Sequence, residues 1–387
     1  MRRALAAAAA AAAALVLGMT AAPPAHAAGT YTVYVCADGN GSGRNNAFSP
    51  SSYGAGVTRG SPSCSPGEGL HTQVGNWNGP YYYPEGGSFA ACAPAGTTIS
   101  AYSASEFSAW QGSGFERRVD GGPCGGFALQ AAGPLGNTFG AELNTGGYGT
   151  WRQSGLAVGG LRFITYCANA APTPCTGSYA ATNWRDVTVT VSDPAKPQLS
   201  NGSGVYGTTG WLRGDQSVGF SAADSSGVIV LRADVDRDAA GNAALRFTDD
   251  EDVAGHCDWA RMAPCRTSES LAPRTIDTTR LPDGEHAVTL YARDSAANSD
   301  EARGTFLVDN SPPSAALVRP PGATGRTVTW RPADAGAGID QASLVAEYAT
   351  SGGAWQSLQA GTYDVAAGTY SATVPASVAA DQVQVRL

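Results

Sequence analysis

The chain has 387 residues, of which 14% are charged, and its formal net charge is −8. A net negative chain with a single lysine, Lys196, is not suited to neutralising phosphates, which excludes nucleic-acid binding, and a hydrophobic fraction of 43% is too high for a disordered chain. The 50 Gly residues, with many Thr, Ser and Val residues, predict an all-β protein with many turns.

Residues 1–27 have the pattern of a secretory signal peptide. Arg2 and Arg3 precede an apolar run, Ala4–Leu17, and the small-residue triplet Ala25-His26-Ala27 provides a cleavage site. The alternative is a transmembrane anchor, but the run is shorter than the roughly 18 residues that a membrane span needs and is mostly Ala. We therefore expect a secreted protein, extracellular or on the cell surface, with no membrane span after cleavage.

Eight cysteines follow the signal peptide, and an even number in an exported chain predicts four disulfides. Two pairs are local, Cys167 with Cys175 and Cys257 with Cys265. The other four allow three connectivities, of which we favour Cys36–Cys64 and Cys92–Cys124 because nearer partners close smaller loops. Zinc is a poor alternative, since no Cys-x2-Cys spacing occurs.

The sequence pattern of residues 28–192 predicts a two-sheet β-sandwich. This segment is rich in glycine, and β-like runs alternate with Gly-rich turns. In Asp186–Val191 the valines at 187, 189 and 191 alternate with threonines, so one face of this strand is expected to be buried. No stretch shows a sustained helical period.

The remainder of the chain contains an internal repeat. Asp193 and Asp309 each begin an Asp-x3-Pro motif after a β run, 116 residues apart, and Ala223-Asp224 recurs as Ala333-Asp334. The spacing predicts an Ig-like domain over residues 193–310 and a second one over residues 311–387. The second one lacks a final strand, so we expect a cut-short domain or a fragment of a longer array, with a sheet edge open to a partner strand.

Several of these motifs resemble known bacterial sequences. Cys92–Ile99, the strand that ends at Cys167, and Asp186–Pro194 resemble the concanavalin-like, jelly-roll N-terminal region of secreted high-GC bacterial surface proteins. Four further segments resemble bacterial Ig-like repeats: Asp224–Val228, Leu281–His286, Ala292–Asn298 and Val308–Pro313. The resemblance implies a jelly-roll β-sandwich followed by Ig-like repeats, with an extracellular, glycan-facing or adhesive role.

The chain lacks the usual signatures of a hydrolase, so we expect it not to be an enzyme. No serine has Gly at both −2 and +2, as an α/β-hydrolase nucleophile would. The nearest carboxylate pair in the first domain is Glu116 and Asp120. Four residues along a strand separate them by about 13 Å, too far for a retaining glycosidase.

The acidic run Asp249, Asp250, Glu251 and Asp252 is a candidate calcium loop, because clustered carboxylates repel one another and an extracellular ion could hold them. The alternative, which we favour, is a solvated loop.

Glycan binding is the leading functional prediction. Sugar rings stack on aromatic faces, and the segment around Trp77 places aromatic and polar residues in a Gly/Pro-flanked loop. The predicted ligand-binding residues are Trp77, Tyr81, Tyr82, Tyr83 and Glu85, with Tyr148 and Trp151 as a second segment. The sequence thus predicts a secreted, non-catalytic binding or adhesion protein for polysaccharide or cell-surface glycan. The alternatives are a structural surface stalk and a glycoside-cleaving enzyme with unfamiliar spacing.

Overall fold

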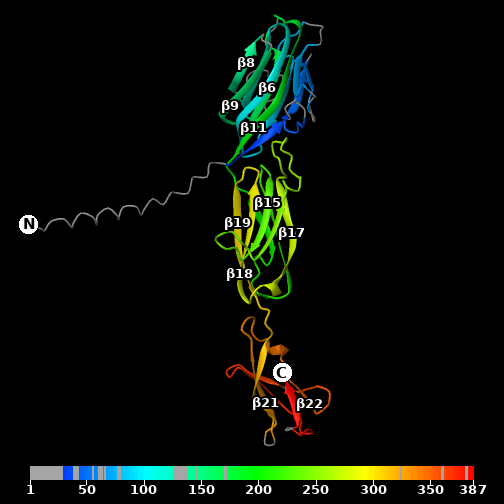
Figure 1. Cartoon of the computed structure of the whole chain (residues 1–387), viewed down its shortest axis with the longest axis vertical. Coiled ribbons are helices and arrows are strands. Elements are labelled where there is room, and N and C mark those ends of the chain that lie inside the picture. The colour runs from blue at the N-terminus through cyan, green and yellow to red at the C-terminus, as the bar shows by residue number, and fades with distance from the viewer. Residues whose placement is uncertain are drawn as a thin grey trace, which may run out of the picture.

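The computed structural model describes residues 29–37, 43–54, 56–59, 64, 67–75, 80–124, 137–143, 147–169, 172–322, 325–358, 361–379 and 382–387. The predicted signal peptide and Trp77 lie outside these residues. Three groups of sheets follow one another along the long axis of the molecule (Figure 1). We call them the first unit (residues 29–193), the second unit (198–308) and the third unit (314–386).

The first unit is a sandwich of two antiparallel sheets. The six-stranded sheet contains β1 (Gly29–Val35), β3 (Gly56–Arg59), β4 (Leu70–Val74), β6 (Thr98–Ser113), β9 (Gly147–Val158) and β11 (Thr176–Asp193). The five-stranded sheet contains β2 (Ser49–Tyr53), β5 (Gly86–Cys92), β7 (Phe115–Gly122), β8 (Asn137–Leu143) and β10 (Gly160–Cys167).

The core of the first unit lies between these sheets. Val187, Val189 and Val191 of β11 are fully buried, as their alternation with threonine predicted. Trp184 lies beside them in sequence and packs its ring against Phe163 of the opposite sheet, with ring centroids 4.9 Å apart. Because both sheets present bulky side chains inward, their outer faces are free to carry polar groups.

Four disulfides close the predicted loops: Cys36–Cys64, Cys92–Cys124, Cys167–Cys175 and Cys257–Cys265. The favoured pairing is therefore confirmed. Three of the bonds lie in the first unit, and the fourth closes a loop of the second unit that faces the first.

The second unit has a three-stranded and a five-stranded sheet. The first contains β12 (Gln198–Gly204), β14 (Asp215–Ala223) and β17 (Ser268–Asp277). The second contains β13 (Trp211–Leu212), β15 (Val228–Val235), β16 (Leu245–Asp250), β18 (Gly284–Asp294) and β19 (Ser299–Val308), and a short 3-10 helix, η2 (Thr278–Arg280), precedes β18.

The third unit repeats this plan on a smaller scale. Its four-stranded sheet contains β20 (Ser314–Arg319), β21 (Thr327–Ala333), β24 (Thr362–Asp364) and β25 (Thr369–Thr373). Its three-stranded sheet contains β22 (Glu347–Thr350), β23 (Gln356–Ser357) and β26 (Val383–Arg386). The 3-10 helix η3 (Gln341–Ser343) precedes β22. Trp330 is buried, whereas Trp211 is 39% exposed because it lies on the short edge strand β13.

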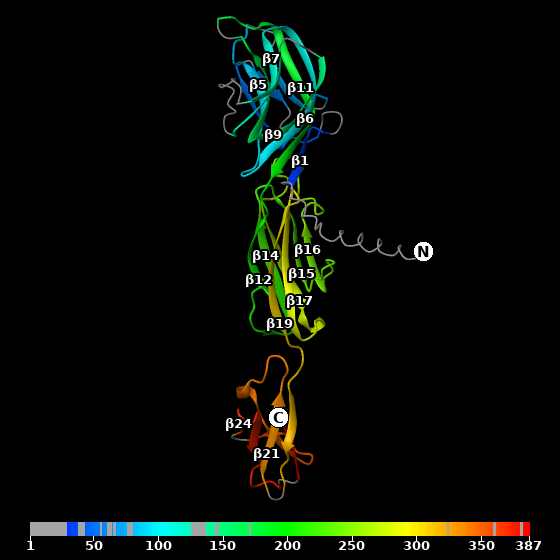
Figure 2. The same cartoon turned by 90° about the vertical axis from the view of Figure 1, so that its left-hand side faces the viewer.

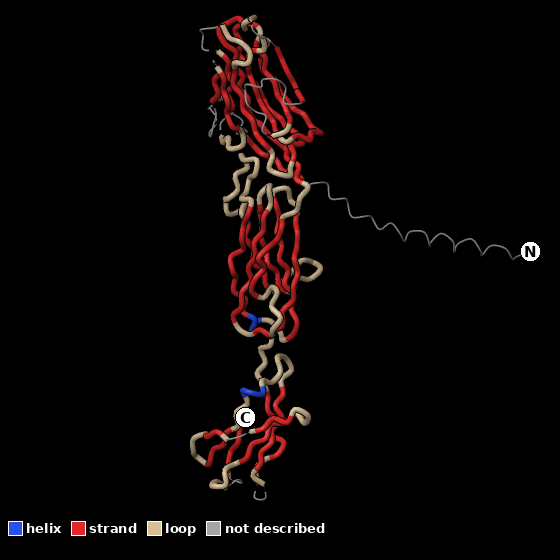
Figure 3. Tube along the Cα trace, turned by 180° about the vertical axis from the view of Figure 1, so that it is seen from behind, coloured by secondary structure: helices blue, strands red, loops and turns tan. Residues whose placement is uncertain are grey.

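The fold is therefore all-β, a disulfide-bonded jelly-roll β-sandwich followed by Ig-like β-sandwich repeats. Strands dominate the described chain, and the two helical segments are single turns (Figure 3). Within the described residues, no helix has the length and apolar character needed to cross a bilayer.

The first and second units share a close joint (Figure 2). The loop that holds the Cys257–Cys265 disulfide reaches up to β1: the Tyr34 N–H donates to the Trp259 carbonyl (2.8 Å) and the Tyr31 hydroxyl donates to the Met262 carbonyl (2.5 Å). The Met262 side chain is 7% exposed and packs in the core of the first unit. The second unit thus completes part of the hydrophobic core of the first.

Candidate functional site

The outer face of the six-stranded sheet carries a row of aromatic and polar side chains. Along β6, Glu106 and Ser108 are buried in the interior of the first unit, so Phe107 between them faces outward. Residues directly opposite in neighbouring strands point to the same face. Phe107 lies opposite Tyr148 of β9 and Asn183 of β11.

The row continues across the rest of the sheet. Asn183 also lies opposite His71 of β4, which lies opposite Arg59 of β3. Five strands therefore contribute one residue each, in the order Tyr148, Phe107, Asn183, His71 and Arg59. We call these residues the cross-strand row.

The aromatic end of the cross-strand row is open to solvent. The Tyr148 side chain is 84% exposed, and its ring packs on Phe107 with centroids 4.8 Å apart and planes tilted by 38°. A tyrosine ring held in this way costs little further conformational entropy when a ligand packs on it.

The polar end of the row is an ordered hydrogen-bonding group. His71 Nδ1 lies 2.6 Å from Asn183 Oδ1, and Nε2 lies 3.1 Å from Gln73 Oε1. Glu68 Oε2 lies 3.9 Å from His71 Nδ1 and 3.8 Å from Arg59. Amide, imidazole, carboxylate and guanidinium groups together supply both donors and acceptors, which hydroxyl-rich ligands require.

The predicted ligand-binding loop at residues 81–85 does not lie on the sheet that carries the cross-strand row. It precedes β5, at the other sheet. Tyr81 is 3% exposed and bridges Cys175 in the interior, so its prediction as a ligand contact is wrong. Tyr82 and Tyr83 are 38% and 39% exposed. Glu85 accepts the Tyr82 N–H (3.2 Å), and the Tyr83 ring packs edge-on against Tyr166.

The second predicted segment is divided between two faces of β9. Tyr148 faces outward, whereas Trp151, three residues further on, faces the core. The Trp151 ring packs against Trp184, and the Arg117 guanidinium lies 5.8 Å from its centroid. Trp151 is therefore partly buried against the core, and only Tyr148 of this segment is widely exposed.

Glu116 and Asp120, the carboxylate pair of the first unit, are bound to basic groups. Arg118 lies between them, 3.1 Å from Glu116 Oε1 and 2.6 Å from Asp120 Oδ1. Arg162 Nη2 lies 2.7 Å from Asp120 Oδ2, and the Tyr166 hydroxyl donates to Glu116 (2.9 Å). Both carboxylates are therefore engaged by protein groups rather than turned together toward a ligand.

The four carboxylates of the acidic run, Asp249–Asp252, contact other groups of the second unit. Asp249 pairs with Arg274 (2.6 Å), and Asp250 accepts the N–H groups of the following turn. The Glu251 carboxylate lies 2.7 Å from His256, and Asp252 accepts the Trp259 indole N–H (2.8 Å). Each carboxylate of the run thus has a partner within the protein.

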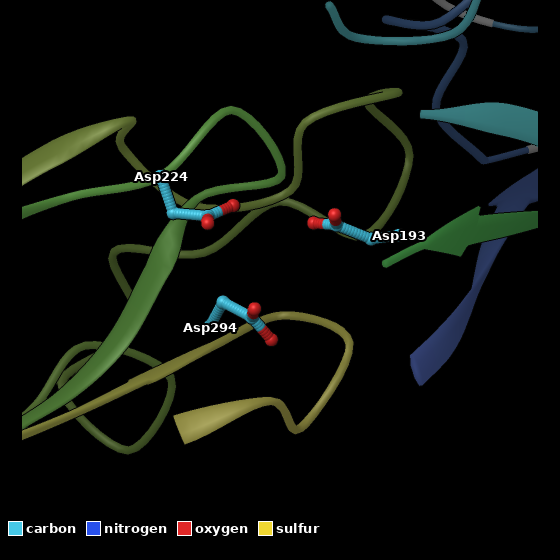
Figure 4. A group of neighbouring side chains, drawn as sticks. All are labelled: Asp193, Asp224 and Asp294. Atoms are coloured by element: carbon cyan, nitrogen blue, oxygen red, sulfur yellow. The ribbon is translucent and has the colours of Figure 1, made fainter. Parts of the chain in front are cut away.

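A different acidic group lies at the joint between the first and second units. Asp193, Asp224 and Asp294 each offer a carboxylate oxygen, and these oxygens all lie within 4.8 Å of one another (Figure 4). All three residues are buried. Burial raises the pKa of Asp294 to about 6, with further upward effects from the charges of Asp224 and Asp193.

The sequence contained a signal for this group. Asp193, Asp224 and Asp294 belong to three of the motifs that mark the Ig-like repeats. The cross-strand row has no comparable signal, because its members come from strands far apart in the chain.

The sequence matches no protein-family model and no curated protein. Solved structures give weak likenesses. Dimeric latent PorU from Porphyromonas gingivalis has a TM-score of 0.22 at 11% identity, over 77% of this chain and 29% of that chain. For the adhesin domain of Epf from Streptococcus pyogenes the TM-score is 0.24 at 10% identity, over 63% of this chain and 77% of that one.

A GH2 beta-galacturonidase from Eisenbergiella tayi gives a TM-score of 0.18 at 10% identity, over 74% of this chain and 46% of that chain. The chain thus spans less than a third of the PorU chain and less than half of the galacturonidase chain.

Proposed function

We propose that this chain is a secreted, non-catalytic binding or adhesion protein that holds a glycan on the cross-strand row of its first unit. The observation that carries the proposal is the alignment of an exposed aromatic ring, Tyr148 on Phe107, with the hydrogen-bonding group of Asn183, His71, Gln73, Glu68 and Arg59 on one sheet face.

This composition fits a sugar for a physical reason. A pyranose ring has an apolar face of C–H groups, which packs on the electron-rich face of an aromatic ring. Its edge carries hydroxyls that both donate and accept hydrogen bonds, which matches the amide and charged groups at the other end of the row. Neighbouring strands lie about 4.8 Å apart, so the row is longer than one sugar unit. A ligand would contact its exposed and half-buried members rather than His71, which is 5% exposed.

A binding function without catalysis is supported by the state of the carboxylates. Glu116 and Asp120 are both held by Arg118. Glu106 lies inside the sandwich, paired with Arg117 at 3.1 Å. A glycosidase needs two carboxylates facing a sugar bond, and these three are engaged in ion pairs instead.

Four disulfides support an oxidising compartment outside the cytosol, in agreement with the signal-peptide pattern of residues 1–27.

The end-to-end order of the three units also favours a second function, a structural stalk that binds no small ligand (Figure 1). In the binding proposal the second and third units hold the first unit away from the surface on which the protein is mounted.

A glycan array probed with the full chain tests the proposal. We expect binding to a subset of glycans, weakened at least about tenfold in Tyr148→Ala and in Phe107→Ala, because each removes apolar contact area. Tyr34→Ala is the matched control, since Tyr34 is also an exposed tyrosine of this sheet but lies on β1, which contributes no residue to the cross-strand row.

Three results would contradict the proposal. Absence of any array signal from the folded chain favours the stalk. Binding that survives Tyr148→Ala but is lost in Tyr82→Ala places the site on the loop before β5. Release of reducing sugar from a bound polysaccharide contradicts the non-catalytic assignment.

A further inference from the structure

The joint between the first and second units brings together three carboxylates from separate parts of the chain. Asp193 ends β11 of the first unit, Asp224 follows β14, and Asp294 ends β18. Their exposed fractions are 0%, 8% and 0%. In Figure 4 the three side chains point toward one shared space between the loops.

No basic side chain of the described residues forms an ion pair with any of the three. Lys196, three residues after Asp193, is 67% exposed and lies 4.0 Å from Asp300. Three like charges within a few ångströms, shielded from water, repel strongly unless protons or a cation neutralise them. The joint therefore has an excess of negative charge.

Asp193 has a buried oxygen without a hydrogen-bond donor among the described residues. Its Oδ1 accepts the Ala195 N–H at 2.9 Å, whereas Oδ2 is buried and accepts no hydrogen bond from the described residues. A buried charged oxygen without a donor is costly, and such groups in native proteins commonly mark the site of an ion or a water molecule.

The second joint provides an internal comparison. Asp309 is the repeat equivalent of Asp193 and accepts the Ser311 N–H in the same way. Its second oxygen, Oδ2, accepts the Ala337 N–H at 2.8 Å. The second oxygen at this repeat position thus has a protein donor at the second joint and none among the described residues at the first joint, where Asp294 adds a third carboxylate.

We propose that Asp193, Asp224 and Asp294 bind one Ca²⁺ ion, which ties the first unit to the second. Calcium takes six to eight oxygen ligands at about 2.3–2.6 Å, so two oxygens on opposite sides of one ion lie about 5 Å apart. The 4.8 Å limit on the separation of the three oxygens satisfies this geometry. Three carboxylates also supply the charge that a hard divalent cation prefers.

The ion would connect two parts that already touch. Asn298 Nδ2 donates both to the Asp193 carbonyl (3.0 Å) and to Asp294 Oδ2 (2.9 Å), so the carboxylates of the two units are held in register before an ion arrives. Bound calcium adds a link between β11 and β18. We therefore expect it to stabilise the first and second units together and to leave the third unit unchanged.

Calorimetric titration of the chelator-treated full chain with CaCl2 tests this inference. We expect one Ca²⁺ per chain, with affinity reduced at least about tenfold in Asp193→Asn and in Asp294→Asn. Asp250→Asn is the matched control. Asp250 belongs to the acidic run, and an asparagine at this position can still accept the two N–H hydrogen bonds of the turn.

Thermal unfolding supplies a second readout that separates lost binding from lost folding. Calcium should raise the melting temperature of the unsubstituted chain. In EDTA, Asp193→Asn should melt no lower than the unsubstituted chain, since it removes one repelling charge, and calcium should no longer shift its melting temperature. These results do not depend on whether the first unit binds a glycan.

Two results would overturn the inference. One is the absence of calcium heat and of any melting shift up to about 10 mM CaCl2, above the range of extracellular calcium modules. The other is calcium binding that persists in both Asp193→Asn and Asp294→Asn but is lost in Asp250→Asn, which assigns the ion to the acidic run.

Discussion

Buried charged side chains in this protein are neutralised in several ways, and each way has a distinct energetic consequence. His286 of β18 lies 2.6 Å from Asp236 and 2.7 Å from the Pro282 carbonyl. Burial lowers the pKa of His286, but the hydrogen bond to Pro282 and the contact with Asp236 outweigh it, so the pKa is raised above 6.5. Arg117 instead meets Glu106 in an ion pair between the two sheets of the first unit.

The His286 contact predicts a pH-dependent stability. Because the folded pKa lies above the unfolded value, the contribution is fully present below about pH 6.5 and is lost as the pH rises through the folded pKa. Asp236→Asn should therefore destabilise the second unit more at pH 5.5 than at pH 9. Denaturant unfolding at the two pH values measures this, and an equal loss at both would contradict it.

The ion pair inside the first unit predicts a strongly non-additive mutant pair. Arg117→Met removes the counter-charge of the buried Glu106 carboxylate and leaves its hydrogen bond from the Ser108 hydroxyl (2.7 Å), and we expect a loss of about 3–5 kcal/mol in the free energy of unfolding. The double variant Arg117→Met with Glu106→Leu should recover most of that loss. A double-mutant cycle with no coupling between the two positions would show that Glu106 is satisfied in another way.

At the scale of elements, local pattern predicted the strands but could not predict their neighbours. The valine alternation in Asp186–Val191 placed the buried face of β11 correctly, and proximity in sequence gave the disulfide pairs. The cross-strand row depends on the register of β9, β6, β11, β4 and β3, which local periodicity does not encode. Tyr81 was misassigned for the same reason, because its ring packs in a core cluster with Phe115 and Cys175, far along the chain.

The disulfides of the first unit predict a graded stability series. Cys36–Cys64 closes a loop with a sequence separation of 28, and Cys167–Cys175 one of 8. In the chain-entropy treatment these contribute about 3.5 and about 2.5 kcal/mol. Replacing each pair with alanines should lower the free energy of unfolding of the first unit in that order. A reversed order would show that native packing outweighs loop entropy.

At the scale of the whole molecule, the two joints differ. The first joint has backbone hydrogen bonds, the buried Met262 side chain and the three carboxylates. At the second joint a cavity of about 560 Å³ separates parts of the two units, lined by Trp211, Leu344 and Leu387 among others. The molecule therefore consists of a coupled pair of sandwiches followed by a more independent third one.

This difference predicts two transitions in differential scanning calorimetry. The first and second units should unfold together, and the third unit separately. Met262→Ala removes a side chain of the second unit from the core of the first, at a cost of about 2–4 kcal/mol, and should split the joint transition into two. A single transition for the whole chain, or no change in Met262→Ala, would contradict the coupling.

The central claim is that the cross-strand row binds a glycan. Its most direct test is oxidative footprinting of the full chain with and without an oligosaccharide identified on the array. Tyr148, at 84% exposure, should be oxidised readily in the free protein and protected in the complex, while Tyr82 and Tyr34 should be oxidised equally in both. Protection of Tyr82 with Tyr148 unchanged would contradict the account.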